Sequence, residues 1–95
     1  MKKLYHICLT TRKGVTFEEV KEKMDYAADW LHYNRDGWFV WTGLDAQQWY
    51  DRLSPLYNPG GSILIVRADL SDYFGLANKA AWPWLLRYKT NPPTE

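Results

Sequence analysis

The chain has 95 residues, enough for one small domain, and its 12 Lys and Arg stand against 11 Asp and Glu, which leaves a formal net charge of +1. Six Trp, seven Tyr and three Phe exclude a disordered chain, and the near-neutral charge excludes the polybasic class of nucleic-acid binders. One cysteine excludes an internal disulfide and a cysteine-based metal site. No apolar run approaches the roughly 18 residues that a membrane span requires, so we expect no membrane association and a cytoplasmic protein.

The aromatic content is high for the size of the core. A chain this short buries about 60–65% of the surface that its unfolded form exposes. We therefore expect some of the aromatic side chains to lie on a surface that a partner covers. The alternative is that Tyr and Trp are simply half-buried, with their polar atoms in water.

The first two expected elements are a strand and a helix. Residues 4–10 alternate weakly between apolar and polar, which is typical of a strand. Thr16 and Glu19 have the spacing of a capping box, which predicts that a helix begins there. Its apolar stripe is expected to consist of Phe17, Val20, Met24, Ala27 or Ala28, and Leu31.

The middle of the chain predicts a hairpin and a second helix. Residues 32–37 are expected to form a short strand and a turn, and residues 38–42 a strand with apolar side chains on both faces. Asp45 and Gln48 form a second capping box. The buried stripe of the helix that follows is predicted to contain Ala46, Trp49, Leu53 and Leu56.

The last third of the chain predicts a strand and a short helix. Residues 58–61 form a turn, and the β-branched run at 62–68 is typical of a central strand. A short helix is expected from about Asn78 to Arg87, although Pro83 removes one amide donor near its first turn. We expect a single domain over residues 1–90 and a frayed tail over 91–95.

The element order is therefore β-α-β-β-α-β plus a terminal helix. This is the α+β, ferredoxin-like topology, with a four-stranded antiparallel sheet and two helices on one face. The other sheet face is expected to be open. The predicted interface combines this face with the C-terminal helix, and its candidate residues are Trp38, Val40, Trp41, Trp82 and Trp84.

Basic residues outside the helix faces suggest a second kind of surface. Arg12, Lys13, Arg35 and Arg67 lie in turns or at a strand end, near Tyr33 and other aromatic residues. Such a set is suited to phosphate contacts and base stacking. The alternative is an ordinary solvated surface of mixed charge, which the net charge of +1 favours.

Motifs for catalysis are scarce, and no catalytic residue is assigned. Asp36 and Asp69 are candidate ligands of Mg²⁺. A divalent cation needs two or more converging oxygens, so a site requires that such carboxylates come together. His6 and His32 lack the spacing of a zinc site. Cys8 is expected to be a small buried hydrophobic residue that shares a strand face with His6. We expect no cofactor, apart from Mg²⁺ if the protein is a nuclease.

Five segments together carry a family resemblance: WLHY at 30–33, GWFVWT at 37–42, RLSPL at 52–56, ILIV at 63–66 and AWPWL at 81–85. The chain resembles the SinR-like branch of the small ferredoxin-like CRISPR-associated endonuclease superfamily, which contributes a subunit to CRISPR adaptation complexes. The resemblance implies a ferredoxin-like fold, a homodimer joined through sheets or last strands, and a link to nucleic acid or to toxin–antitoxin systems.

One departure from the family pattern affects the expected activity. Active members carry a metal-binding Asp at the end of the first strand, where this chain has Thr10 and Thr11. A hydroxyl cannot replace a carboxylate as the main ligand of Mg²⁺, which argues against an enzyme. We therefore expect a non-catalytic protein-interaction module of antitoxin, inhibitor or accessory type that forms a homodimer or binds a partner protein. The alternatives are a Mg²⁺-dependent RNA or DNA endonuclease and a non-catalytic nucleic-acid binder.

Overall fold

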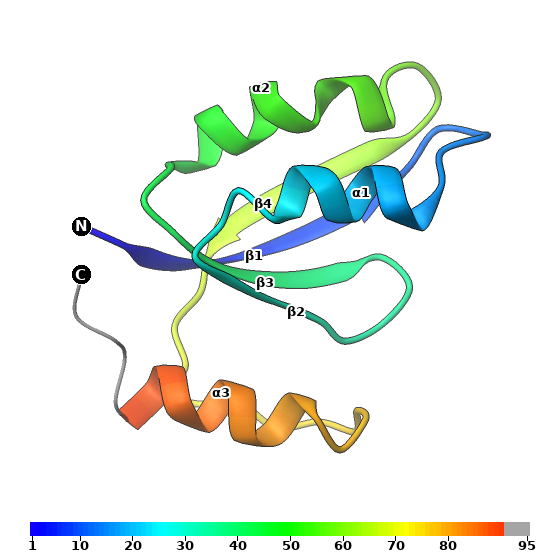
Figure 1. Ribbon diagram of the computed structural model, residues 1–95. Coiled ribbons are helices and arrows are strands. Elements are labelled where there is room, and N and C mark those ends of the chain that lie inside the picture. Colours follow the sequence, from blue (N-terminus) through cyan, green and yellow to red (C-terminus); the bar gives the residue numbers. More distant parts are fainter. Residues whose placement is uncertain (91–95) are drawn as a thin grey trace.

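The computed structural model describes residues 1–90, and the tail predicted at 91–95 lies outside the described residues. The elements are β1 (Lys3–Thr10), α1 (Phe17–Met24), β2 (Asp29–His32), β3 (Gly37–Thr42), α2 (Ala46–Tyr57), β4 (Ser62–Arg67) and α3 (Ala81–Thr90). One antiparallel sheet has the strand order β2-β3-β1-β4. Helices α1 and α2 lie over one face of this sheet, and α3 lies over the other (Figure 1). This architecture confirms the predicted α+β, ferredoxin-like fold.

No helix within residues 1–90 combines the length and the apolar character that crossing a bilayer demands.

Both predicted capping boxes are formed. The Thr16 side chain accepts a hydrogen bond from the Glu19 amide, and the Glu19 carboxylate accepts one from the Thr16 amide. Asp45 and Gln48 make the same reciprocal pair at the start of α2. Each box satisfies two amides that would otherwise lack an acceptor, which fixes where the helix begins.

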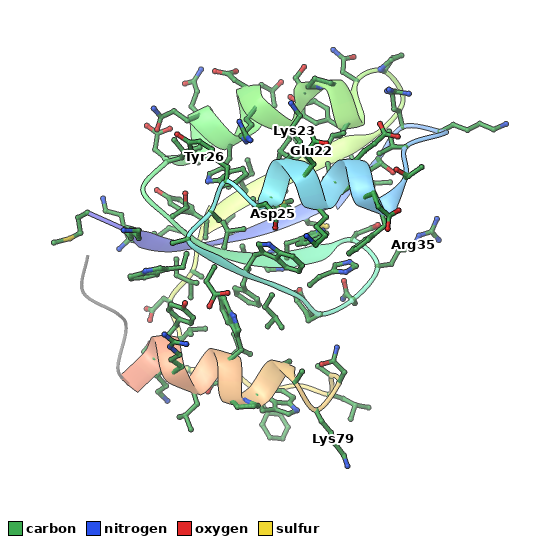
Figure 2. All side chains as sticks on the ribbon, in the orientation of Figure 1. Glu22, Lys23, Asp25, Tyr26, Arg35 and Lys79 are labelled. Carbon is green, nitrogen blue, oxygen red and sulfur yellow. The ribbon has the colours of Figure 1, made fainter. Side chains whose placement is uncertain are left out.

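The end of α1 differs from the prediction, because the helix stops at Met24 and the predicted stripe continued to Leu31. Asp25 caps the helix, and its carboxylate accepts hydrogen bonds from Lys21 Nζ at 2.9 Å and from Trp30 Nε1 at 2.8 Å. Asp25 and Tyr26 lie where the chain leaves α1 and turns back toward the sheet (Figure 2). Leu31 is on β2 and faces away from α1, toward α3.

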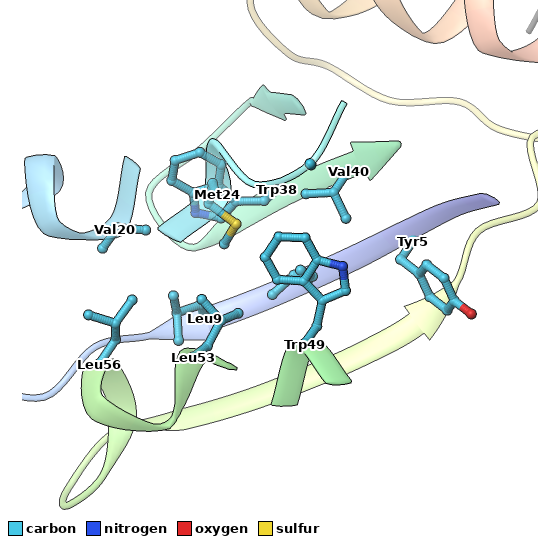
Figure 3. Packing of buried hydrophobic residues seen from close by; sticks show 11 residues of the cluster. Tyr5, Leu9, Val20, Met24, Trp38, Val40, Trp49, Leu53 and Leu56 are labelled. Atoms are coloured by element: carbon cyan, nitrogen blue, oxygen red, sulfur yellow. The ribbon is translucent and has the colours of Figure 1, made fainter. Parts of the chain in front are cut away.

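The main core lies between the sheet and helices α1 and α2. Trp49 and Leu53 of α2 are fully buried in one cluster with Ile7 of β1 and Val40 of β3. Figure 3 shows Trp49 and Leu53 pointing from α2 toward the sheet that carries Val40. The predicted stripe of α2 is confirmed at Trp49, Leu53 and Leu56, each of which is buried. At about 25 cal/mol per Å² of apolar surface, burial of such side chains is the main favourable contribution to the stability of the domain.

A second, smaller core lies under α3 and corrects the expectation of an open sheet face. Leu31 of β2 is buried with Ala81 and Leu85 of α3, and Phe39 of β3 packs against this cluster. Helix α3 therefore covers the half of the face formed by β2 and β3. Pro83 is the third residue of α3, where its missing amide would have had no partner within the helix.

Candidate functional site

The predicted interface residues on β3 divide between the two faces of the sheet. Trp38 and Val40 are 2% and 0% exposed and belong to the main core under α1 and α2. The prediction that they form an interface is therefore wrong, because a partner cannot reach them in the folded chain. Trp41 lies on the opposite face, half-buried, with its ring centroid 5.2 Å from that of Tyr88.

The two predicted interface residues on α3 are also half-buried. The Trp84 ring packs against Tyr88 at 4.3 Å between centroids and against Phe39 at 6.4 Å. Trp82 belongs to the same second core. Much of the aromatic surplus in this part of the chain is thus used to attach α3 to the sheet.

The half of this face formed by β1 and β4 carries exposed apolar side chains. Cys8 is exposed, in contrast to the buried position expected for it, and its cross-strand neighbour Leu64 is 64% exposed. Val66 is 45% exposed and lies opposite His6, whose ring contacts Phe39 at 4.8 Å between centroids. We call Cys8, Leu64 and Val66 the β1/β4 strip. Large apolar side chains that stay exposed next to each other are typical of an interaction surface.

Strand β4 is an edge strand, although its sequence predicts a central one. The Ala68 amide donates to the Leu4 carbonyl, which identifies the residues of β4 that bond to β1. Because hydrogen-bonded positions alternate along an antiparallel ladder, Ser62, Leu64 and Val66 bond to β1. The amides and carbonyls of the intervening residues, Ile63 and Ile65, are therefore directed to the open edge.

An apolar groove runs beside this edge on the other face of the sheet. Ile63 and Ile65 of β4 line it on one side, and Ala46 and Tyr50 of α2 line it on the other. Ile63 and Ile65 are only half-buried, and Tyr50 is 50% exposed. Apolar surface is thus accessible on both sides of β4. The β-branched run in the sequence does indicate apolar surface on both sides of this strand. Because the run was assigned to a central strand, that surface was expected to be buried.

The predicted nucleic-acid residues do not form one surface. Arg12, Lys13 and Arg35 lie at the end of the sheet where β1 finishes, and Arg35 projects from the tip of the β2–β3 hairpin (Figure 2). Arg67 lies at the opposite end, where β4 pairs with the start of β1. The Arg12 guanidinium also donates to the carbonyl of Pro55 at 2.9 Å, which ties the turn after β1 to the end of α2.

The two metal candidates are also far apart. Asp36 accepts a hydrogen bond from Thr10 Oγ1 at 3.1 Å, at the end of β1. Asp69 follows β4 at the other end of the sheet and accepts from the Ser71 amide at 2.9 Å, and its hydrogen bonds with Ser71 lower its pKa. Within residues 1–90, no three His, Cys, Asp or Glu side chains are grouped so that they could hold a metal ion.

A polar cluster lies next to the β1/β4 strip. His6 Nε2 and Tyr33 Oη form a hydrogen bond of 2.6 Å between β1 and the β2–β3 hairpin. Burial lowers the pKa of His6, so its imidazole is neutral at neutral pH. Burial, followed by the electrostatic effect of Cys8, raises the pKa of Tyr33. A neutral imidazole can donate to or accept from the phenol, depending on its tautomer, and in either case the bond links β1 to the β2–β3 hairpin.

Comparisons of the chain with protein families, with curated proteins and with solved structures returned no match. The resemblance to the CRISPR-associated superfamily therefore stays a prediction, and so does the function that it implies.

Proposed function

We propose that the protein is a protein-interaction module that forms a homodimer through β4. The observation that carries this proposal is the mismatch between the sequence of β4, which is that of a central strand, and its place at the edge of the sheet. A second copy that adds its own β4 makes both strands central and pairs the outward backbone groups of Ile63 and Ile65.

The composition of β4 supports pairing with another strand. Edge strands are usually protected by proline, by charged side chains or by bulges. Strand β4 has no proline and no charge before its last residue, Arg67. The other edge strand, β2, offers a contrast, since it is only four residues long and begins with Asp29.

Two-fold symmetry suits this strand. An antiparallel β4–β4 pair is isologous, so each copy gives the same surface and the assembly closes as a dimer. Leu64 and Val66 then meet their symmetry equivalents on one face, and the groove beside Ile63 and Ile65 closes on the other. The apolar side chains on both sides of the strand lose their contact with water, which is the main source of binding free energy.

The proposal is tested by measuring the molar mass in solution across a concentration series with light scattering. We expect a dimer for the natural chain and a monomer for Leu64→Lys, because the new ammonium group would be placed in the apolar contact. Leu76→Lys is the matched control, since Leu76 is 101% exposed on the loop before α3. It should stay dimeric. A natural chain that is monomeric up to its solubility limit, or equal behaviour of the two variants, would overturn the proposal.

A further inference from the structure

A cavity of about 250 Å³ lies between α3, the loop that precedes it and the β2–β3 hairpin. Its walls are mainly aromatic and aliphatic and include Phe39, Tyr73, Ala77, Ala81, Trp82 and Leu85. It lies on the face of the sheet opposite α1 and α2 and is built from other residues than the β4 edge. The homodimer therefore leaves it unexplained.

We propose that this cavity is a binding site for a small, neutral aromatic molecule. Ligand pockets are mostly lined by apolar and aromatic side chains, with a few polar groups that fix orientation. Apolar cavities of roughly 150 Å³ hold benzene, so 250 Å³ is sufficient for a single or fused ring.

The charge of the lining determines the class of ligand. Within residues 1–90, none of the side chains that line the cavity is charged. Its polar groups are the phenols of Tyr33 and Tyr73, the side-chain amide of Asn34 and the indole N–H of Trp82. The phenol of Tyr33 already bonds to His6, and the Asn34 side-chain oxygen already accepts from the Gly37 amide. The Lys89 ammonium lies over the Tyr73 ring, 5.2 Å from its centroid, and is not part of the lining. A carboxylate or ammonium among the lining side chains would lose hydration without an ionic partner among them, which favours neutral molecules.

The mouth of the cavity gives the ligand a route in from solvent. Phe74 and Leu76 line it on either side of Gly75, and their side chains are 103% and 101% exposed. A bound ring would remove apolar surface of these two residues from water, as well as that of Phe39 and Trp82 inside. The free energy of this burial favours the complex.

The cavity also offers positions where added side-chain volume would fill it. Ala77 lines the cavity, and Ala77→Leu adds three carbon atoms there. At Gly75, a Cβ would lie 3.8 Å from Trp82 Cη2, an ordinary van der Waals contact, so Gly75→Val narrows the same cavity from the loop side. Ala80→Leu is the matched control, because Ala80 is exposed and does not line the cavity.

The test uses indole as the neutral probe and benzoate as the charged one, with amide NMR shifts of the full chain as the readout. We expect indole to shift the amides of residues 73–77 and of Ala81, Trp82 and Leu85 saturably and to raise the melting temperature, since a ligand of the native state stabilises it. Benzoate at the same concentration should do neither. Binding should be lost in Ala77→Leu and Gly75→Val and kept in Ala80→Leu.

Three results would overturn the proposal: no saturable shifts with indole, shifts that map outside these residues, or equal shifts in the natural chain and in both filled variants. If one filled variant does not fold, the other decides the question. Neither filled variant alters β4, so each should have the same molar mass in solution as the natural chain. A loss of indole binding at unchanged molar mass therefore tests the cavity independently of the homodimer.

Discussion

Trp49 donates its indole Nε1–H to Thr42 Oγ1 across 3.1 Å, and both residues are buried between α2 and β3. The same oxygen accepts the Leu44 amide at 3.1 Å. One hydroxyl therefore satisfies two donors at the point where β3 leads into α2. Thr42→Val keeps the shape of the side chain and removes the acceptor, so we expect a loss of about 1–3 kcal/mol in the free energy of unfolding.

The measurement is urea unfolding followed by circular dichroism. Thr42→Ser is the matched control, because it keeps the oxygen and removes only a methyl group. It should cost clearly less than Thr42→Val. Equal losses in the two variants would mean that packing, and not the hydrogen bonds, accounts for the effect.

A second hydrogen bond attaches α3 to the sheet. Tyr88 Oη donates to the Asp29 carboxylate at 2.6 Å, and burial followed by this bond raises the pKa of Tyr88. Tyr88→Phe keeps the ring that packs on Trp84 and removes the hydroxyl. We expect it to lower the free energy of unfolding by about 1–2 kcal/mol and to speed amide hydrogen exchange in α3.

Tyr26→Phe is the comparison for this variant. Tyr26 is 61% exposed, and the contact of its ring with the Arg52 guanidinium, 4.5 Å from the ring centroid, remains in Phe. Its unfolding free energy should be unchanged. Unchanged amide exchange in α3 of the Tyr88→Phe protein would contradict the role of this bond in attaching α3 to the sheet.

The His6–Tyr33 pair predicts a dependence of stability on pH. Burial lowers the pKa of His6 below its usual value of about 6.5, so the unfolded chain takes up this proton more readily than the folded one. The contribution of His6 to stability is therefore complete above about pH 6.5 and is lost as the pH falls through the folded-state pKa. The free energy of unfolding should decrease between pH 7 and pH 5.

The comparison is with His6→Gln, because the Gln side chain does not titrate in this pH range. Its unfolding free energy, measured by denaturant titration at several pH values, should fall less over the same interval. NMR titration of the His6 ring should give a midpoint below 6.5. Identical pH profiles for the two proteins would show that His6 is not the group responsible.

The parts of the fold that local sequence determines were predictable. The capping boxes at Thr16 and Asp45 depend on residues three positions apart, and both are present. The end of α1 was not predictable, because Leu31 continues a helical spacing although it lies on β2. Asp25 caps the helix, and its hydrogen bond from Trp30 Nε1 joins residues that come together only when the chain has turned, so local spacing does not reveal it.

The candidate site was harder to predict, because it depends on which layer covers which face. Trp38 and Trp41 are both aromatic and lie on opposite faces of β3, and the sequence does not indicate which of them faces the main core. The β-branched run of β4 indicated burial on both sides. Because β4 lies at the edge of the sheet, the same pattern leaves apolar side chains exposed instead of burying them.

The β4–β4 dimer predicts disulfide cross-links between copies. With the backbone groups of Ile63 and Ile65 at the open edge, the two-fold antiparallel pairs that overlap the longest stretch of β4 bring either Leu64 opposite Leu64 or Ile65 opposite Ile65. Directly opposed residues have Cα atoms about 4.5–5.5 Å apart, within the range that a disulfide spans.

In a Cys8→Ser background, one of the variants Leu64→Cys and Ile65→Cys should therefore cross-link efficiently under mild oxidation, as measured on non-reducing gels. Leu76→Cys, which is more exposed than either β4 position and lies on the loop before α3, should remain largely monomeric on such gels. Cross-linking of Leu76→Cys as fast as of the β4 variants would show that collision alone explains the product, and absence of cross-linking at both β4 positions would exclude the pairing.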